Sequence, residues 1–409
     1  MNEVIQVLPS KEQSDILVAK YFEAVDPVYP MINRETFQKD YDNFWLAQTI
    51  DHRHADGSLI ALIFAMLAMG TQFVDLPSPD EKEQTAEFYI SASHQALRVI
   101  NYLARPSGRT MQTMVLIMYF LMNDNHAADA WAFAGMLTRH ACALGYHRDP
   151  SITAIKASHF EKQQRRKIWQ AVLFQDTFFS VILKLPPNAT HSDCRVEDLA
   201  PEMDPSLTID GASDISYIAG MWRLANLVQP TICTPHSLDL PISANEQQRH
   251  SILAEFQAVY AAFPLPFRTF NDIAICDLAA RSPRLARQAL FVTSNYNHCL
   301  MLIHADEHEQ LPLDVYGTLD AAHEAISSFF LLHKLFEDEA RVWYHFQHRA
   351  FSEALVIAEL VKNKVDLSAM DPKRVRAKDD IIRMIGILGM TSEHDAVART
   401  RGALLSKYL

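Results

Sequence analysis

Asp176 is the residue whose setting most suggests chemistry, because this acid lies on an otherwise apolar helical face. Between 161 and 185, Trp169, Leu173 and Phe179 fall on the same face at helical spacing. A buried carboxylate is costly unless an arginine or several backbone donors pair with it. No second acid or nucleophile is spaced to work with Asp176, so we favour a structural bridge over a catalytic acid. The candidate arginine partners in the same stretch are Arg139, Arg148, Arg165 and Arg166.

Two histidines form the pair that most resembles a metal site. His304 and His308 are four residues apart, so they would share one helix face and could hold a metal together with a nearby acid. Their order is not that of the zinc proteases, because Ala305 stands where the general base would follow the first histidine. We favour a solvated helix end that leads into Pro312, and the sequence predicts no metal and no other cofactor.

Other catalytic patterns are missing from the sequence. It has no glycine-rich phosphate loop and no G-x-S-x-G nucleophile motif. The acidic run 337–339 does not form the inward-facing acid cluster that a helical enzyme such as a terpene cyclase needs. A helical enzyme is therefore kept only as an alternative, with no catalytic residue assigned. The cysteines are scattered without a C-x-x-C pair, which argues against a disulfide framework or a cysteine zinc site: Cys142, Cys194, Cys233, Cys276 and Cys299.

The composition fits a folded helical protein that does not bind nucleic acid by itself. The 409 residues include only 11 glycines, whereas sheet proteins of this size usually spend more glycine on turns. With 37 basic and 49 acidic residues, the formal charge of −12 repels phosphate backbones. The apolar runs 59–70 and 114–122 are too short to span a bilayer, so we expect no membrane contact.

Two helices around a turn must position Asp176. Residues 131–144 repeat apolar positions every three to four residues, and Gly145 can adopt the left-handed conformation that ends a helix. An Asp-Pro step then marks a turn. The next helix begins near Glu161 and stops before a pair of prolines, which cannot continue it.

The rest of the chain has the same helical character. We predict an all-α fold, a multi-helix array of packed antiparallel helix pairs. Its N-terminal half spans 1–185, a connecting loop spans 186–213, and its C-terminal half spans 214–409. Besides the two helices above, apolar periodicity predicts helices over 11–22, 34–45, 59–73, 80–104, 110–122, 214–227, 247–262, 284–305, 318–336, 342–361, 379–389 and 393–408.

One dense basic run follows Pro372. It could be a nuclear import signal, and the alternative is a solvated linker before the last helices. The cations of this candidate signal are Lys373, Arg374, Arg376 and Lys378.

The order of these motifs resembles the regulatory domain of fungal zinc-cluster transcription factors, called the middle homology region. The segment 26–37 is similar to its opening Pro-x-x-Pro…Thr-Phe motif, and 295–302 to a later helix. The centre of the resemblance is the HRDP motif at 147–150, followed by the acid, arginines, tryptophan and aspartate of the next helix. The residues that the resemblance marks as a structural motif are Gly145, Arg148, Asp149, Pro150, Arg165, Arg166, Trp169 and Asp176.

The sequence departs from the family pattern in three places. The six-cysteine DNA-binding module does not occur in it, and a longer gene encoding that module upstream remains an alternative. The family's Gly-Arg-Pro step after the central helix is Leu183-Lys184-Leu185-Pro186 here, and Thr177 replaces the arginine that follows the aspartate. These last two changes concern the local turn and a salt bridge.

The resemblance implies a transcription regulator that works in the nucleus through protein partners. These would be DNA-binding zinc-cluster proteins or a second copy in a homodimer, with indirect DNA contact. A small-molecule effector whose binding residues are unknown, and control of a metabolic gene cluster, are further implications. The alternatives are a helical sensor or scaffold without a transcriptional role that binds a zinc-cluster partner, and the helical enzyme considered above.

Overall fold

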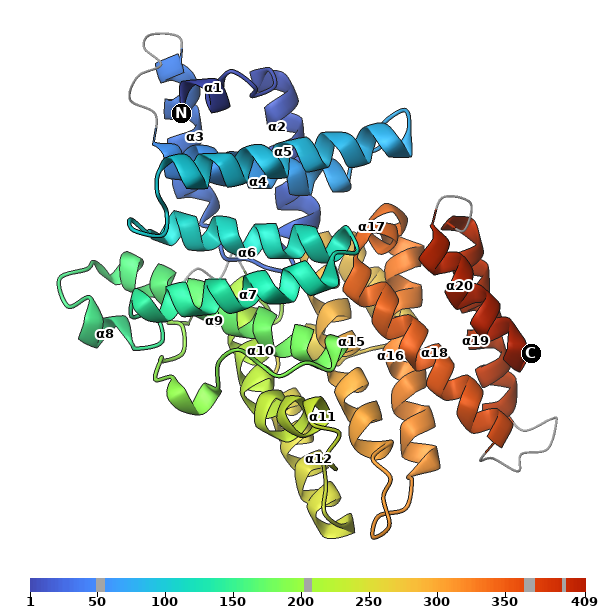
Figure 1. The fold of residues 1–409 in the computed structure, drawn as a ribbon. Coiled ribbons are helices and arrows are strands. Elements are labelled where there is room, and N and C mark those ends of the chain that lie inside the picture. The colour runs from blue at the N-terminus through green and yellow to red at the C-terminus, as the bar shows by residue number, and fades with distance from the viewer. Residues whose placement is uncertain (49–55, 202–207, 364–371, 392–394) are drawn as a thin grey trace. The chain divides into compact units, whose positions relative to one another are not determined.

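The computed structural model describes residues 1–48, 56–201, 208–363, 372–391 and 395–409. All the regular elements in these ranges are helices, and none is a β-strand (Figure 1). The predicted all-α fold is therefore confirmed. In the same ranges, no helix combines the length and the apolar character needed to cross a bilayer.

The chain divides into two compact units. The first comprises Met1–Asp176 and Asn188–Pro205, and the second comprises Thr177–Pro187 and Ser206–Leu409. Much of the predicted connecting loop thus belongs to the first unit. The predicted domains 1–185 and 214–409 stay predictions, since a compact unit is not shown to fold alone.

The helix α4 (Gly57–Gln72) forms the centre of the first unit. Nearly all its residues are buried, as its apolar sequence on every side predicts. The helices α2, α5 and α6 pack against it (Figure 1). The elements of this unit are α1 (Asn2–Ile5), α2 (Lys11–Lys20), the π-helix η1 (Tyr21–Val25), α3 (Arg34–Gln48), α4, α5 (Pro79–Val99), α6 (Gly108–Asn123), α7 (Ala127–Ala143), α8 (Pro150–Thr153), η3 (His191–Asp193) and the larger part of α9 (His159–Leu183).

Gly70 sets the packing of α2 on α4. A Cβ atom added at this glycine would lie 2.2 Å from the backbone oxygen of Leu17 in α2. Because a backbone atom cannot turn aside as a side chain can, any larger residue would push the two helices apart. The close approach of α2 and α4 therefore requires a glycine at this position.

The second unit is a row of helices in which α15, α16, α18, α19 and α20 pack in succession. Helices that contact each other across a short connection reverse the chain direction, which agrees with the predicted antiparallel pairs. The elements of this unit are α10 (Asp214–Val228), the π-helix η5 (Gln229–Cys233), α11 (Thr234–Ser237), α12 (Glu246–Ala261), α13 (Leu265–Arg268), α14 (Asp272–Arg281), α15 (Pro283–His304), α16 (Val315–Leu335), α17 (Glu337–Val342), α18 (Tyr344–Asn363), α19 (Pro372–Thr391), α20 (Ala396–Leu405) and η6 (Ser406–Tyr408).

Candidate functional site

A buried ionic centre in the first unit joins the turn at Asp149 to the helix α9. Asp149 caps α8, and its Oδ1 accepts hydrogen bonds from the backbone N–H and the hydroxyl of Ser151 at 2.9 and 2.6 Å. Arg166 donates Nε–H to Oδ2 and Nη2–H to Oδ1 of Asp149, both at 2.8 Å. The backbone N–H of Glu197 completes the set at 3.1 Å from Oδ2. Asp149 therefore accepts hydrogen bonds from three different residues.

The charges of this centre are compensated inside the protein. Asp149 and Arg166 are both buried. Burial alone would raise the pKa of Asp149, but the bonds from Arg166, Ser151 and Glu197 outweigh it and hold that pKa well below its usual range. The bond to Asp149 raises the pKa of Arg166. The pair is ionised at neutral pH, and all these bonds suit a fixed structural clasp better than proton transfer.

Glu197 is the member of this centre that the sequence analysis missed. Its carboxylate accepts a hydrogen bond from Nη2 of Arg166 at 2.9 Å, while 72% of its side chain stays exposed. It lies in the segment predicted as a long exposed connection, 31 residues from its partner. No periodicity links a loop acid to a helix so far away, so the sequence held no signal for this contact.

The residues around Asp149 shape the turn. Gly145 follows α7 with φ of +73°, a left-handed conformation that other residues rarely adopt. Pro150 is the first residue of α8, where its missing N–H costs nothing. Arg148 is exposed, and its backbone forms an isolated bridge with Arg195.

Arg165 and Trp169 attach α9 to the same turn. Arg165 donates Nη2–H to the carbonyl oxygen of Leu144 at 3.0 Å, and its guanidinium lies 4.2 Å from the ring centre of Tyr146. Trp169 is fully buried, with its ring centre 6.3 Å from that of His147. Both side chains therefore hold α9 against the end of α7.

Asp176 is also buried on α9, and donors of the following loop bind it. Its Oδ2 accepts hydrogen bonds from the backbone N–H of Asn188 at 2.8 Å and of Ala189 at 3.2 Å, and its Oδ1 accepts one from Nδ2 of Asn188 at 2.7 Å. The candidate arginine partners were Arg139, Arg148, Arg165 and Arg166, but the hydrogen bonds described for this carboxylate come from Asn188 and Ala189, while Arg165 binds Leu144 and Arg166 binds Asp149 and Glu197. The alternative of several backbone donors describes this site.

The environment of Asp176 differs from that of Asp149 in its balance of burial and charge. Burial raises the pKa of Asp176 to about 6, although the bonds from Asn188 and Ala189 act in the opposite direction. Neutral donors thus only partly replace an arginine. Within the described residues, this gives Asp176 a structural role with a carboxyl group that titrates in the mildly acidic range.

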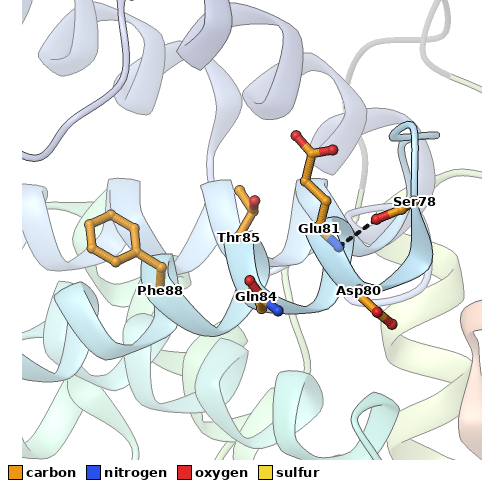
Figure 2. A pocket seen from close by; sticks show the side chains of 6 residues that line it. All are labelled: Ser78, Asp80, Glu81, Gln84, Thr85 and Phe88. Atoms are coloured by element: carbon orange, nitrogen blue, oxygen red, sulfur yellow. Dashed lines mark hydrogen bonds between the residues drawn. The ribbon is translucent and has the colours of Figure 1, made fainter.

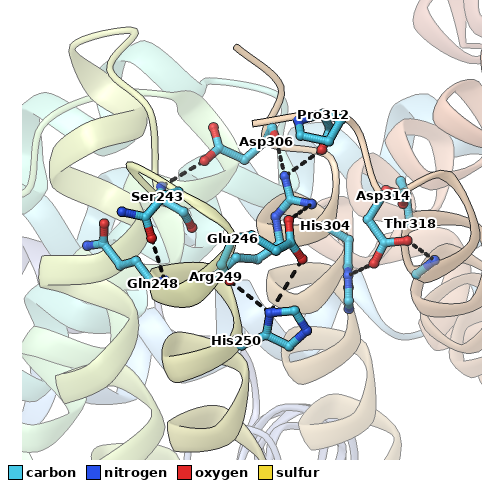
Figure 3. A network of polar contacts seen from close by, with 12 residues as sticks. Ser243, Glu246, Gln248, Arg249, His250, His304, Asp306, Pro312, Asp314 and Thr318 are labelled. Carbon is cyan, nitrogen blue, oxygen red and sulfur yellow. Dashed lines mark hydrogen bonds and ion pairs between the residues drawn. The ribbon is translucent and has the colours of Figure 1, made fainter. Parts of the chain in front are cut away.

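The histidine pair of the second unit is divided between separate partners. His304 Nδ1 lies 2.7 Å from Oδ2 of Asp314, as Figure 3 shows, whereas His308 Nε2 lies 2.8 Å from the carbonyl oxygen of Ser243. Near them, Arg249 donates to the carbonyl oxygens of Asp306 and Pro312 at 2.8 Å each. No three His, Cys, Asp or Glu residues are grouped to hold a metal ion in the part of the chain that the structure describes.

The candidate import run lies in a helix. Residues 372–391 form α19, so the linker that was considered as its alternative is wrong for this run. Lys373 contacts Asp320 at 2.8 Å, and Arg376 contacts Glu324 at 3.3 Å. Two of the four cations thus face acids of α16, while Arg374 and Lys378 are exposed.

The comparison with known proteins agrees with the motif that this centre contains. A family model described as fungal specific transcription factor domain matches residues 18–237, which include the ionic centre and Asp176. The chain belongs to this family. The resemblance noted in the sequence is therefore confirmed.

Several fungal proteins are similar to part of this chain. The Zn(2)-C6 fungal-type transcription factor mpsB of Macrophomina phaseolina is 30% identical over 201 residues, which cover 47% of this chain and 26% of that protein. Transcription factor FBD3 of Gibberella moniliformis is 22% identical over 329 residues, 78% of this chain and 43% of its own. The equisetin cluster transcription factor eqxF of Fusarium heterosporum is 24% identical over 204 residues, which cover 46% of this chain and 28% of that protein. The chain thus spans less than half the length of these relatives.

Proposed function

We propose that this chain is the regulatory part of a nuclear transcription regulator. The observation that carries the proposal is the family match over residues 18–237. The names of mpsB, FBD3 and eqxF all describe transcription factors. The buried centre of Asp149, Arg166 and Glu197 would serve this role by fixing α9 to the turn after α7. The family is one of transcription factors, and we assign no catalytic activity to the chain.

Protein partners would connect the chain to DNA. A formal charge of −12 opposes direct contact with phosphates, so DNA contact would be indirect. A DNA-binding zinc-cluster protein would supply this contact, and a second copy of the chain in a homodimer is the other candidate partner. The name of eqxF, a transcription factor of the equisetin cluster, supports control of a metabolic gene cluster. A small-molecule effector that binds this chain would adjust the activity of the DNA-bound partner.

Genomic occupancy tests this function. The tagged chain is crosslinked in its own cells and precipitated, and the recovered DNA is sequenced. We expect enrichment at promoters, and expression of the neighbouring genes should change when the chain is deleted. A matched control is the Asp149→Asn variant, which should lose the buried centre and with it the enrichment. Absence of enrichment for the wild-type chain at equal abundance would contradict the proposal and favour a sensor or scaffold without a transcriptional role.

The import run provides a second, independent test. Replacing Lys373, Arg374, Arg376 and Lys378 by Gln should move a fluorescently tagged chain from the nucleus to the cytoplasm. A charge-matched control replaces four exposed cations of the first unit by Gln: Lys39, Arg98, Arg105 and Lys156. The proposed signal is wrong if both variants distribute alike.

A further inference from the structure

One face of α5 is open to solvent although it carries apolar side chains. Phe88 is 49% exposed and Val99 is 44% exposed. Together with Thr85, Ala92 and Gln95 they form a stripe whose members are three or four residues apart, so they share one face of the helix. In this stripe Phe88 and Val99 are the exposed apolar members, Ala92 is buried, and Thr85 and Gln95 are polar. Exposed apolar side chains beside a hollow suit a contact with another molecule, whereas scattered single ones are ordinary.

The stripe is hollowed in two adjoining places that share Phe88. One hollow of about 430 Å³ lies beside the first turns of α5, where Figure 2 shows Glu81, Thr85 and Phe88 in succession. The other, of about 260 Å³, lies between the second half of α5 and the first residues of the chain, and its walls include Val4 and Val7. From residue 81 to residue 99 the groove is roughly 27 Å long at 1.5 Å per residue.

The short helix α1 builds one wall of the groove. It packs on α5 and buries Val4 and Ile5. Val7, just beyond this helix, remains 41% exposed and lines the second hollow with Phe88 and Val99. The second half of the groove is thus lined by apolar side chains from both elements, together with Glu3, Ser91 and Gln95.

The first half of the groove is acidic. Between residues 79 and 88, four acids stand against the single cation Lys82: Asp80, Glu81, Glu83 and Glu87. Asp80 and Glu81 line the first hollow itself. Glu83 and Glu87 lie on another face of the helix, where their charges add to the rise to about 6 that burial causes in the pKa of Asp124.

We infer that this groove binds an amphipathic helix of a partner protein that carries Lys or Arg at one end. Apolar residues at positions i, i+3 or i+4, and i+7 of that helix would fill the hollows around Phe88 and Val99. The cations of its other end would lie against Asp80 and Glu81, which line the first hollow. The groove would bind such a helix whatever process the chain serves.

Charge and shape favour this occupant over a second copy of the chain. A contact between the grooves of two identical copies would bring their acids together without a basic side chain to oppose them, because no Lys or Arg among the described residues lines either hollow. A basic helix instead fills the hollows and neutralises the acids. The apolar contacts and the charge attraction would both act along the same 27 Å of α5, which is about the length of five helical turns.

Selection from a random peptide display library tests the inference. The purified full chain is the bait, and the Phe88→Ser variant is used for counter-selection. We expect enriched peptides to be helical, apolar at the stated spacing, and basic at one end. Their affinity should fall at least tenfold for Phe88→Ser and for the double variant Asp80→Lys with Glu81→Lys, whose acids line the first hollow, and it should weaken with salt.

A matched control distinguishes binding in the groove from nonspecific binding to exposed apolar surface. Phe160, at the start of α9, is 46% exposed, so Phe160→Ser removes a similar apolar surface elsewhere and should leave the affinity unchanged. Equal melting temperatures for the wild-type chain and both Ser variants show that the fold is intact. The inference is overturned if no enriched peptide depends on Phe88, if the enriched peptides are acidic or extended, or if Phe88→Ser instead dissolves a dimer of the chain.

Discussion

Two buried carboxyl groups, one in each unit, have opposite protonation states at neutral pH. In the first unit, Asp149 accepts two bonds from Arg166 at 2.8 Å and stays ionised. In the second, Glu353 lies 2.9 Å from Nδ1 of His298, and burial raises the pKa of Glu353 to about 8 despite the positive charge of Arg349. Burial also lowers the pKa of His298 to about 3. This pair is neutral at pH 7, so the number of donors around the acid decides whether a buried carboxyl group carries charge.

Replacing Asp149 should break the first unit's centre and produce the largest effect. Asp149→Asn keeps the size but leaves the buried charge of Arg166 with only the exposed partner Glu197, and such losses cost about 3–5 kcal/mol. We expect the free energy of unfolding, measured by urea denaturation, to fall by about 3 kcal/mol. The matched variant Glu197→Gln removes the exposed partner of the same arginine and should cost less than about 1 kcal/mol. Similar losses for both variants would contradict the assignment of Asp149 as the essential partner.

Replacing Asp176 should reduce the free energy of unfolding by an amount between the effects of replacing Asp149 and replacing Glu353. Asp176→Ala removes the acceptor for three bonds of the loop at Asn188 and Ala189, and buried donors left unpaired cost about 1–3 kcal/mol each at most. We expect a total loss of about 2–3 kcal/mol. Asp176→Asn should cost less, because one oxygen still accepts the two backbone bonds and the amide of Asn188 can turn. Thermal unfolding of both variants checks this order, and equal melting temperatures would show that the loop bonds require a charged acceptor.

These centres show how far the sequence could be read. The all-α fold and most long helices follow from apolar periodicity, and α4 is central because it is apolar on all sides. The short helix α14 was not predicted. The helix α19 was predicted to begin near 379, because its basic first turns look like a linker, whereas it begins at Pro372. Ion pairs with α16 stabilise those turns, and sequence periodicity does not report such contacts between distant segments.

The candidate site was only half predictable for the same reason. The motif placed Asp149, Arg166 and Asp176 in one stretch, but it left open which acid takes which arginine. The geometry of the turn decides this, since Asp149 caps α8 at a position where both its oxygens reach Arg166. Glu197 and Asn188 come from a loop whose path no pattern of residues specifies, so their contacts appear only in the structure.

Glu353→Gln tests whether Glu353, unlike Asp149, is neutral in the folded protein, because the variant replaces a neutral acid by a neutral amide. The folded-state pKa of Glu353 is raised, so its contribution to stability is full below the unfolded pKa near 4.5 and is lost as the pH rises to about 8. The lowered pKa of His298 acts in the opposite sense below pH 6.5. Between pH 6.5 and 8, Glu353 should therefore lower the wild-type stability by roughly 2 kcal/mol.

The Gln variant should lack this part of the pH dependence and should be at least as stable as the wild type at pH 7. Urea denaturation at several pH values between 6.5 and 8 measures the slope. Asp149 supplies the control, because its lowered pKa places its titration far below this range and Asp149→Asn should leave the slope unchanged. A wild-type stability that stays constant over this range would mean that Glu353 is ionised, as Asp149 is.

The smallest effect is expected at the surface of the second unit, where Lys373 contacts Asp320 at 2.8 Å and both side chains are partly exposed. Exposed pairs contribute about 0–1 kcal/mol, because water screens the charges and two long side chains must be ordered. Lys373→Gln should therefore change the free energy of unfolding by less than about 1 kcal/mol, and salt should shrink this difference further. A loss above 2 kcal/mol would show that α19 depends on this pair for its position. The import test would then require substitutions at Arg374 and Lys378 alone, since a displaced α19 would itself alter the distribution of the chain.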